Sequence, residues 1–259
     1  MRLGICIYDI AHASLAQKAG FDYFEYPFSK LVSMTDIAFD AFCEEVNRLG
    51  FFPEVMVKML DSAQHLTGDN VDTQALHDYC EKGFARCARL GVKGFVFGSD
   101  GARNLPEGFT DRMKGYDQLE AFLLMVSELA EPYGYEFYIE PLTMGHGKGA
   151  NIISFIGEGA YLALRVNRPN VALMVDWYHS TNNRDSMRMI PYVGELLRHF
   201  HLSTLDRKYP SANDQQDYSE FFDALKAIGY NGRVTIEAKT PAAFEEAAQE
   251  AVKRIKPLM

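Results

Sequence analysis

Four residues that can bind a metal ion stand at the ends of four successive apolar segments in the second half of the chain. The clearest is Asp176, which ends the run Val171–Asp176. A run of this length is typical of a fully buried strand. Glu140, His201 and Glu237 end similar segments. Three carboxylates and one imidazole suit Mn²⁺, Mg²⁺ or Co²⁺, whereas zinc more often recruits additional His or Cys. The pattern predicts a site for one divalent cation, with Mn²⁺ favoured.

A site of this kind could act on a sugar next to its carbonyl group. Removal of a proton there creates an enediolate, and a divalent cation that bridges two substrate oxygens would stabilise the negative charge. Two carboxylates on opposite faces of the substrate would give epimerisation. One carboxylate that carries the proton between neighbouring carbons would give aldose–ketose isomerisation. The sequence leaves both reactions open and does not identify the sugar.

These residues can meet only if the fold brings the four strand ends together. Apolar strand patterns and amphipathic helix patterns alternate through the chain, which predicts a parallel sheet. Strands are expected at Leu3–Tyr8, Phe21–Tyr26, Phe51–Val57, Lys93–Phe97, Glu136–Glu140, Val171–Asp176, His199–Ser203 and Arg233–Ala238. Eight such units favour an α/β (β/α)8 TIM barrel as one domain over residues 1–259. The alternative is a doubly wound sheet, but no Gly-x-Gly-x-x-Gly follows the first strand.

Local signals place some of the helices and loops. Thr35 is a plausible cap for a helix over Asp36–Leu49, and a second helix is expected over Asp185–Leu197. Thr240 and Pro241 are expected to begin the last helix, as its cap and first residue. The Gly-rich stretch 145–149 is expected to form a flexible loop.

The composition limits the possible partners. The chain has 259 residues, 47% of them hydrophobic, and a net charge of −9, which argues against a nucleic-acid surface. The four cysteines form no C-x-x-C pair, so buried free thiols in a reducing compartment are expected. No apolar run approaches the roughly 20 residues of a membrane-spanning helix. The chain opens directly into an apolar strand, so a cytoplasmic location is expected.

Short motifs at the last four strand ends carry a family resemblance. They read Glu140-Pro141-Leu142, Asp176-Trp177-Tyr178-His179, His199-Phe200-His201 with Arg207 six residues on, and Ile236-Glu237. The chain resembles the xylose isomerase-like TIM barrels, and within them the sugar phosphate isomerase/epimerase group with its ketohexose 3-epimerases. The resemblance covers nearly the whole chain and includes the segment around Gly98 and Arg103.

The resemblance implies roles for individual residues. The expected metal ligands are Glu140, Asp176, His201 and Glu237. Glu140 and Glu237 would also be the catalytic acid/base pair, and His179 and Arg207 would contact substrate oxygens. His199 is expected one layer deeper, in packing. Ketohexose epimerases of this group usually carry a second Glu six residues after the strand-five Glu, where this chain has His146.

Other residues have two interpretations each. Tyr8, His146 and Glu25 could line the substrate pocket, although Glu25 fits a salt bridge equally well. Trp177 could stack on a sugar or pack in the core. Cations at Arg207-Lys208 and Lys239 could meet a substrate phosphate or simply be solvated.

Three classes of function therefore remain. The favoured one is a metal-dependent isomerase or epimerase acting on a small sugar, sugar phosphate or hydroxy-keto acid. A non-catalytic sugar-binding barrel would not need both Glu140 and Glu237. An apurinic endonuclease would need three zinc ions, more histidines than the seven present and a basic groove. Homodimers or homotetramers are common in such barrels, but the sequence does not specify the assembly.

Overall fold

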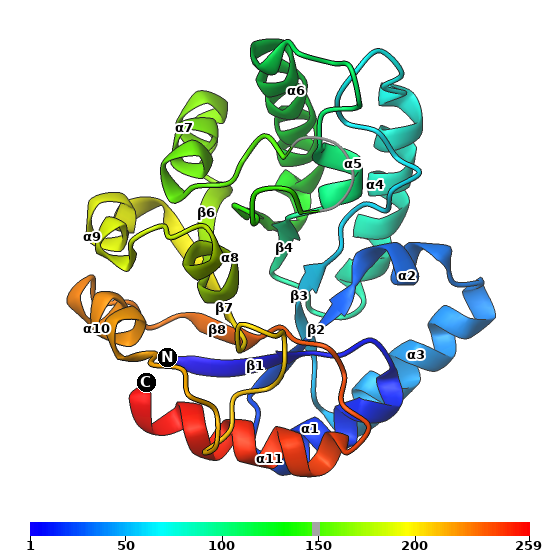
Figure 1. The fold of residues 1–259 in the computed structure, drawn as a ribbon. Helices are drawn as coiled ribbons and strands as arrows, with labels where there is room; N and C mark the ends of the chain where they lie inside the picture. Colours follow the sequence, from blue (N-terminus) through cyan, green and yellow to red (C-terminus); the bar gives the residue numbers. More distant parts are fainter. Residues whose placement is uncertain (147–150) are drawn as a thin grey trace.

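Eight parallel strands close into a barrel surrounded by helices (Figure 1). The computed structural model describes residues 1–146 and 151–259. In order around the barrel the strands are β1 (Arg2–Cys6), β2 (Tyr23–Pro27), β3 (Pro53–Val57), β4 (Gly94–Phe97), β5 (Glu136–Ile139), β6 (Val171–Asp176), β7 (Leu197–Leu202) and β8 (Arg233–Ile236). Strands β8 and β1 pair in parallel and complete the ring. The predicted (β/α)8 barrel is confirmed.

Helices follow the strands and cover the outside of the barrel. They are α1 (Ala13–Ala19), α2 (Phe28–Ser33), α3 (Asp36–Leu49), α4 (Thr73–Ala88), α5 (Asp100–Arg103), α6 (Arg112–Ala130), α7 (Ile156–Val166), α8 (Trp177–Asn182), α9 (Ile190–Val193), α10 (Ser219–Ala227) and α11 (Phe244–Ile255). Among the described residues, none of these helices combines the length and the apolar character needed to cross a membrane. Helix α3 has the predicted bounds, and the Thr35 side chain accepts a hydrogen bond from the backbone N–H of Ala38.

The predicted boundaries of two helices were wrong. The segment 185–197 contains only the four-residue helix α9 between single 3₁₀ turns, and Leu197 already belongs to β7. Pro191 and Gly194 lie inside this segment, and both residues disfavour a continuous helix. The last helix begins at Phe244, so Thr240 is not its cap and Pro241 is not its first residue. Within the predicted flexible loop 145–149, residues 147–149 lie outside the described part of the chain.

Helix α2 packs against α4 through a close approach at Gly83. A Cβ atom at this position would lie 2.0 Å from Phe28 Cζ and 2.7 Å from Val32 Cγ2. Phe28 is fully buried and packs edge-on against Phe95 of β4, so its ring has no free space to move into. The absence of a side chain at Gly83 therefore sets the distance between the two helices.

Substituting Gly83→Ala is expected to lower the free energy of unfolding by about 1–3 kcal/mol, because the new methyl group overpacks this contact. Gly157→Ala in α7 is the matched control, since a Cβ atom there meets no atom within 4 Å. In a helix that substitution should raise the free energy of unfolding by up to about 1 kcal/mol. Urea denaturation of both variants measures the difference, and equal effects would contradict the proposed contact.

Candidate active site

The four predicted metal ligands meet at the carboxyl-terminal mouth of the barrel. Asp176 is the last residue of β6 and His201 lies next to the end of β7, where the two residues are paired in register. Glu140 and Glu237 come directly after β5 and β8. One ligand atom from each of the four residues lies within 4.8 Å of the corresponding atom of every other. This convergence of strand ends is the usual location of an active site in a TIM barrel.

The donor set fits a divalent cation. Glu140 Oε1 and His201 Nδ1 are buried and have no hydrogen-bond partner among the described residues. His201 Nδ1 lies 3.8 Å from Glu140 Oε1 and 3.6 Å from Glu237 Oε2, so these atoms face one another across a gap too wide for a hydrogen bond. Buried polar atoms without partners are costly. A cation coordinated by these atoms would remove that cost.

Two features outside the ligand set position Glu140. A Cβ atom on Gly98 would lie 2.2 Å from Glu140 Oε2, so only glycine at the end of β4 leaves space for this carboxylate. Arg103 is fully buried, and its Nη1 donates to the carbonyl oxygens of Phe97 (2.9 Å) and Glu140 (2.8 Å). The guanidinium thus ties the ends of β4 and β5 together. The family resemblance pointed to the segment around Gly98 and Arg103, but the sequence did not reveal these contacts.

Below the ligand set, Glu25 of β2 forms the centre of a buried polar cluster. Its Oε2 lies 2.9 Å from His201 Nε2, and its Oε1 accepts a hydrogen bond from Thr235 Oγ1 (2.5 Å). His199 Nε2 lies 2.7 Å from the same Oε1. All four side chains are fully buried. Of the two interpretations of Glu25, the structure supports the salt bridge, and His199 lies one layer deeper than His201, as predicted.

The contact with Glu25 determines how His201 faces the cavity. A carboxylate accepts hydrogen bonds only, so the His201 nitrogen that faces it, Nε2, carries the proton. In a neutral imidazole Nδ1 then presents a lone pair toward Glu140 and Glu237, as a metal ligand must. In the metal-free protein, burial alone would lower the pKa of His201, but Glu25 and Glu237 outweigh it and raise the pKa well above its usual value. Burial alone would raise the pKa of Glu25, but His201 and His199 hold it well below its usual range.

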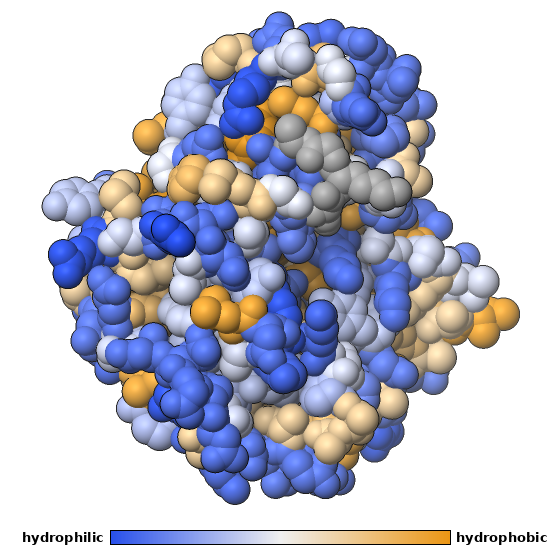
Figure 2. Space-filling view, viewed as in Figure 1, coloured by the Kyte–Doolittle hydropathy of each residue, from blue (hydrophilic) through white to orange (hydrophobic). Residues whose placement is uncertain are grey.

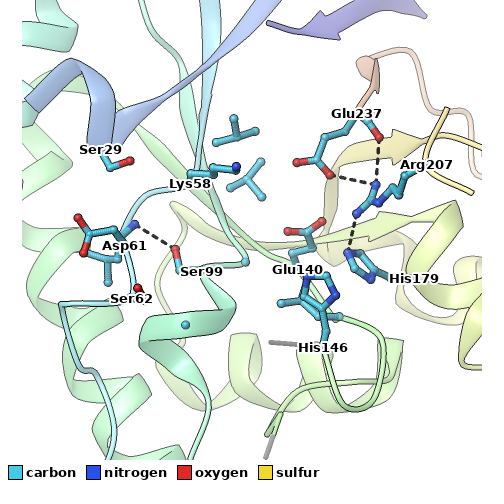
Figure 3. Close-up of a pocket in the computed structure, with 16 residues that line it drawn as sticks. Ser29, Lys58, Asp61, Ser62, Ser99, Glu140, His146, His179, Arg207 and Glu237 are labelled. Carbon is cyan, nitrogen blue, oxygen red and sulfur yellow. Dashed lines mark hydrogen bonds and ion pairs between the residues drawn. The ribbon is translucent and has the colours of Figure 1, made fainter. Parts of the chain in front are cut away.

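Arg207 links two of the predicted metal ligands, Asp176 and Glu237, to His179 on the wall of the cavity. Its Nη1 lies 2.9 Å from Asp176 Oδ2. The same Nη1 lies 3.1 Å from Glu237 Oε2 (Figure 3). Burial alone would raise the pKa of Glu237, but Arg207 and His201 lower it well below its usual value. Burial and the charge of Glu237 raise the pKa of Glu140 to about 8. The two carboxylates predicted as an acid/base pair therefore have pKa values pushed in opposite directions.

His179 of α8 is held as a neutral imidazole. The backbone N–H of Thr143 donates to its Nδ1 (2.9 Å), and Arg207 Nη2 lies 2.8 Å from its Nε2, so each ring nitrogen faces an N–H donor and the doubly protonated imidazolium is disfavoured. Burial lowers the pKa of His179 to about 4, consistent with this state. The side chain is fixed on both sides, with its ring next to that of His146 at 5.1 Å between centroids.

A cavity of about 330 Å³ lies in front of these groups, near the lower end of the usual size range of small-molecule sites. It corresponds to a hollow with a largely hydrophilic rim at the centre of the face in Figure 2. Glu140, His146, His179, Arg207 and Glu237 line it, as do Lys58, Ser99 and other residues from the ends of β3 and β4. A second cavity of about 480 Å³ shares several of these lining residues and includes Tyr8.

Trp177 does not line either cavity. It is buried, and its ring packs edge-on against Tyr218 at 4.8 Å between centroids. Of its two interpretations, the structure supports core packing over sugar stacking. Lys58 was missed, because a single lysine after a strand gives no recognisable signal in the sequence.

Comparison with known proteins places this arrangement in a family. The model of the xylose isomerase-like TIM barrel family matches residues 13–258. The chain belongs to this family. Membership agrees with the closed barrel and with the resemblance seen at the strand ends.

Two curated relatives of this xylose isomerase-like protein show the chemistry found among similar sequences. D-psicose 3-epimerase of Ruminiclostridium cellulolyticum is 32% identical over 113 residues, which are 43% of this chain and 37% of that protein. Inosose isomerase of Bacillus subtilis is 29% identical over 147 residues, which are 52% of this chain and 51% of that protein. The matched segments thus span about half or less of the length of these relatives.

Solved structures agree on the fold. D-allulose 3-epimerase from Methylomonas sp. in complex with D-allulose superposes with a TM-score of 0.84 at 19% identity, over 100% of this chain and 97% of that one. The IOLI protein with a bound zinc atom gives a TM-score of 0.76 at 18% identity, over 100% and 98% of the chains. At these identities the similarity shows the fold alone.

Proposed function

We propose that this chain is a sugar isomerase or epimerase that depends on one divalent metal ion and moves a proton at the carbon next to the substrate carbonyl. The observation that carries the proposal is the convergence of Glu140, Asp176, His201 and Glu237 within 4.8 Å of one another. Sequence relatives named as a 3-epimerase and an isomerase support the reaction class. The zinc atom in a structure of the same fold supports a metal.

The residues of the chain have distinct tasks in this proposal. Glu140, Asp176, His201 and Glu237 would hold the cation, which would polarise the carbonyl and stabilise negative charge on the substrate oxygens. Glu237, held ionised by Arg207, takes the proton from the substrate carbon. Glu140, the second carboxylate of the pair, returns a proton from the opposite face of the substrate. His179 and Arg207 orient the substrate by hydrogen bonds to its oxygens.

Deuterium uptake tests the reaction class directly. The protein is incubated in D₂O with Mn²⁺ and a panel of ketoses, ketose phosphates and small hydroxy-keto acids. We expect deuterium to appear at one carbon next to the carbonyl of one substrate class, and to stop appearing after chelation. The position of the label and the product together distinguish epimerisation from isomerisation.

Metal analysis of the purified protein separates the alternatives. One divalent ion per chain supports the proposed function, and its identity decides between manganese, magnesium, cobalt and zinc. Three zinc ions with cleavage of abasic DNA would support an apurinic endonuclease. Sugar binding without bound metal or exchange would support a non-catalytic barrel. Either of the last two results would overturn the proposal.

A further inference from the structure

Three residues that line the cavity have a backbone conformation that non-glycine residues rarely adopt. In the described part of the chain, five non-glycine residues have positive φ. Lys58 (48°), Ser99 (42°) and Arg207 (58°) are three of these five, and all three line the cavity in front of the metal ligands. Left-handed backbone at non-glycine residues is costly and tends to occur at functional sites. Arg207 already contacts the carboxylates of Asp176 and Glu237 there. Lys58 and Ser99 are therefore the two residues of this group that remain to bind a substrate.

Lys58 directs a cation into the cavity without a carboxylate partner. It follows β3, and its carbonyl oxygen accepts a hydrogen bond from the backbone N–H of Ser29 (3.2 Å). Its Nζ lies 4.6 Å from the centroid of the Tyr8 ring, which fixes the direction of the side chain. Among the described residues, no carboxylate oxygen lies within 4.0 Å of this Nζ. Figure 3 shows Lys58 extending from the β3 side toward Glu237 and Arg207.

Of the other charges that line the cavity, Arg207 has carboxylate partners, whereas Asp61 has no cationic partner within 4.0 Å among the described residues. The guanidinium of Arg207 faces Asp176 and Glu237. The carboxylate of Asp61, on the wall near Lys58, accepts a hydrogen bond from the backbone N–H of Ala63 at 2.8 Å. A divalent cation would further balance the carboxylates at the opposite end. Lys58 has no carboxylate within 4.0 Å among the described residues and extends toward Glu237 and Arg207 (Figure 3), so its ammonium group can bind an anionic group of a substrate.

The second cavity extends the same positive region outward. It shares Lys58, His146, Arg207 and Glu237 with the first cavity, and Lys239 is added to its lining. Three of its lining residues are thus permanent cations and only Glu237 is acidic, on a chain with a net charge of −9. A local reversal of charge sign at a binding cavity attracts ligands of the opposite sign.

We propose that Lys58 binds a terminal oxyanion of the substrate, so that the preferred substrate is a ketose carrying a carboxylate or a phosphate at the end remote from the reacting carbon. The inference rests on the proposed function, because the metal ligands set which end of the sugar reacts. The hydroxyl of Ser99, which accepts from the backbone N–H of Leu60 at 3.1 Å, lies in the same cavity and can donate a further hydrogen bond to the oxyanion. Lys58 is then a specificity-determining residue, separate from the acid/base pair.

The test compares three ketoses of the same chain length: the neutral sugar, its terminal phosphate and the corresponding keto-uronate. Deuterium exchange with the metal-loaded protein gives kcat/KM for each. We expect one of the two anionic forms to exceed the neutral sugar by about ten-fold or more, the size of a charge-assisted hydrogen bond. Which anionic form is preferred identifies the carboxylate or the phosphate as the bound group.

Lys58→Met removes the charge and keeps the length of the side chain. It should reduce the anionic-to-neutral ratio of kcat/KM by about ten-fold, mainly through KM. Lys82→Met, on the exposed surface of α4, removes the same charge elsewhere and should leave the ratio as in the wild type. A wild-type preference for the neutral sugar, or an unchanged ratio in Lys58→Met, would overturn the inference.

Calorimetric titration of the metal-loaded protein measures sugar binding without turnover, and so tests the oxyanion site separately from the proposed catalytic activity. The probes are the same three sugars, and turnover is not needed. Binding of an anionic sugar that weakens about ten-fold in Lys58→Met, with no exchange on any sugar, would support the oxyanion site and reject the isomerase. Exchange on the neutral sugar alone, with all three sugars binding equally well to the wild type and to Lys58→Met, would support the isomerase and reject the oxyanion site.

Discussion

Glu237→Gln is expected to lower the rate of deuterium exchange into the substrate by about a thousand-fold or more, while the fold survives. An amide cannot accept the proton that the carboxylate is proposed to take, and removal of a general base alone costs about 10²–10⁴ in rate. The substitution also replaces a charged metal ligand by a neutral one. Gln has nearly the same size as Glu and can still accept a hydrogen bond, so Arg207 retains a partner.

The control for this variant is Glu54→Gln. Glu54 of β3 pairs with Arg2 and Arg233 through contacts of 2.8 Å or less. Like Glu237→Gln, the Glu54→Gln variant therefore loses a carboxylate that is paired with a cation. It stands near the start of β3, away from the barrel mouth where Glu237 follows β8. We expect its exchange rate to stay within about three-fold of the wild type, because it touches no reacting group.

Two measurements decide the outcome for Glu237. Circular dichroism and thermal unfolding show whether the variant is folded, and mass spectrometry of the sugar reports exchange. Wild-type exchange in a folded, metal-loaded Glu237→Gln would remove this residue from the mechanism. Loss of exchange together with loss of metal would assign it to metal binding alone. Loss of exchange with metal retained is the result we expect.

The strand ends of this barrel could be predicted because the information is local. Val171–Asp176 is a short apolar run that ends in a carboxylate, and the structure gives β6 these same bounds. Parallel strands in a closed barrel all end at one face, so a polar residue at the end of each strand is sufficient to predict the convergence. The register between β6 and β7 then places Asp176 beside His201.

The residues that support the site could not be predicted, because their roles depend on distant parts of the chain. Glu25 contacts His201, which is 176 positions away in the sequence. A single acidic residue in the apolar strand β2 was equally consistent with a pocket wall. For Arg103 the sequence offered only a segment that shares the family resemblance, yet its side chain is fully buried and donates to two strand-end carbonyls. The left-handed backbone of Lys58 likewise has no signature in the sequence.

Glu25 provides the second large expected effect. Glu25→Ala leaves His199 and His201 buried without the carboxylate that faces both of them. Removing one partner of a buried charged group typically costs about 3–5 kcal/mol of folding free energy. The metal-free variant should therefore unfold at much lower urea concentration than the wild type. Thr235→Val keeps the Glu25 carboxylate and removes its hydrogen bond from Thr235 together with the hydrogen bond between Thr235 Oγ1 and Tyr23 Oη, so it should cost less, about 1–3 kcal/mol.

Glu25→Gln separates the effect on the metal site from the effect on stability. The Gln side chain has one accepting oxygen in place of two, so it can accept from only one of the two imidazoles, and its NH₂ group faces the other. If the NH₂ group faces His201, the proton must leave Nε2 and occupy Nδ1, the atom proposed to bind the cation. Loss of such a supporting contact typically lowers metal affinity about 10–100-fold. Calorimetric titration with Mn²⁺ measures this change, and ¹⁵N NMR of the zinc-loaded protein reports which nitrogen of His201 carries the proton. Wild-type Mn²⁺ affinity with the proton still on Nε2 would show that Glu25 stabilises the barrel without orienting the ligand.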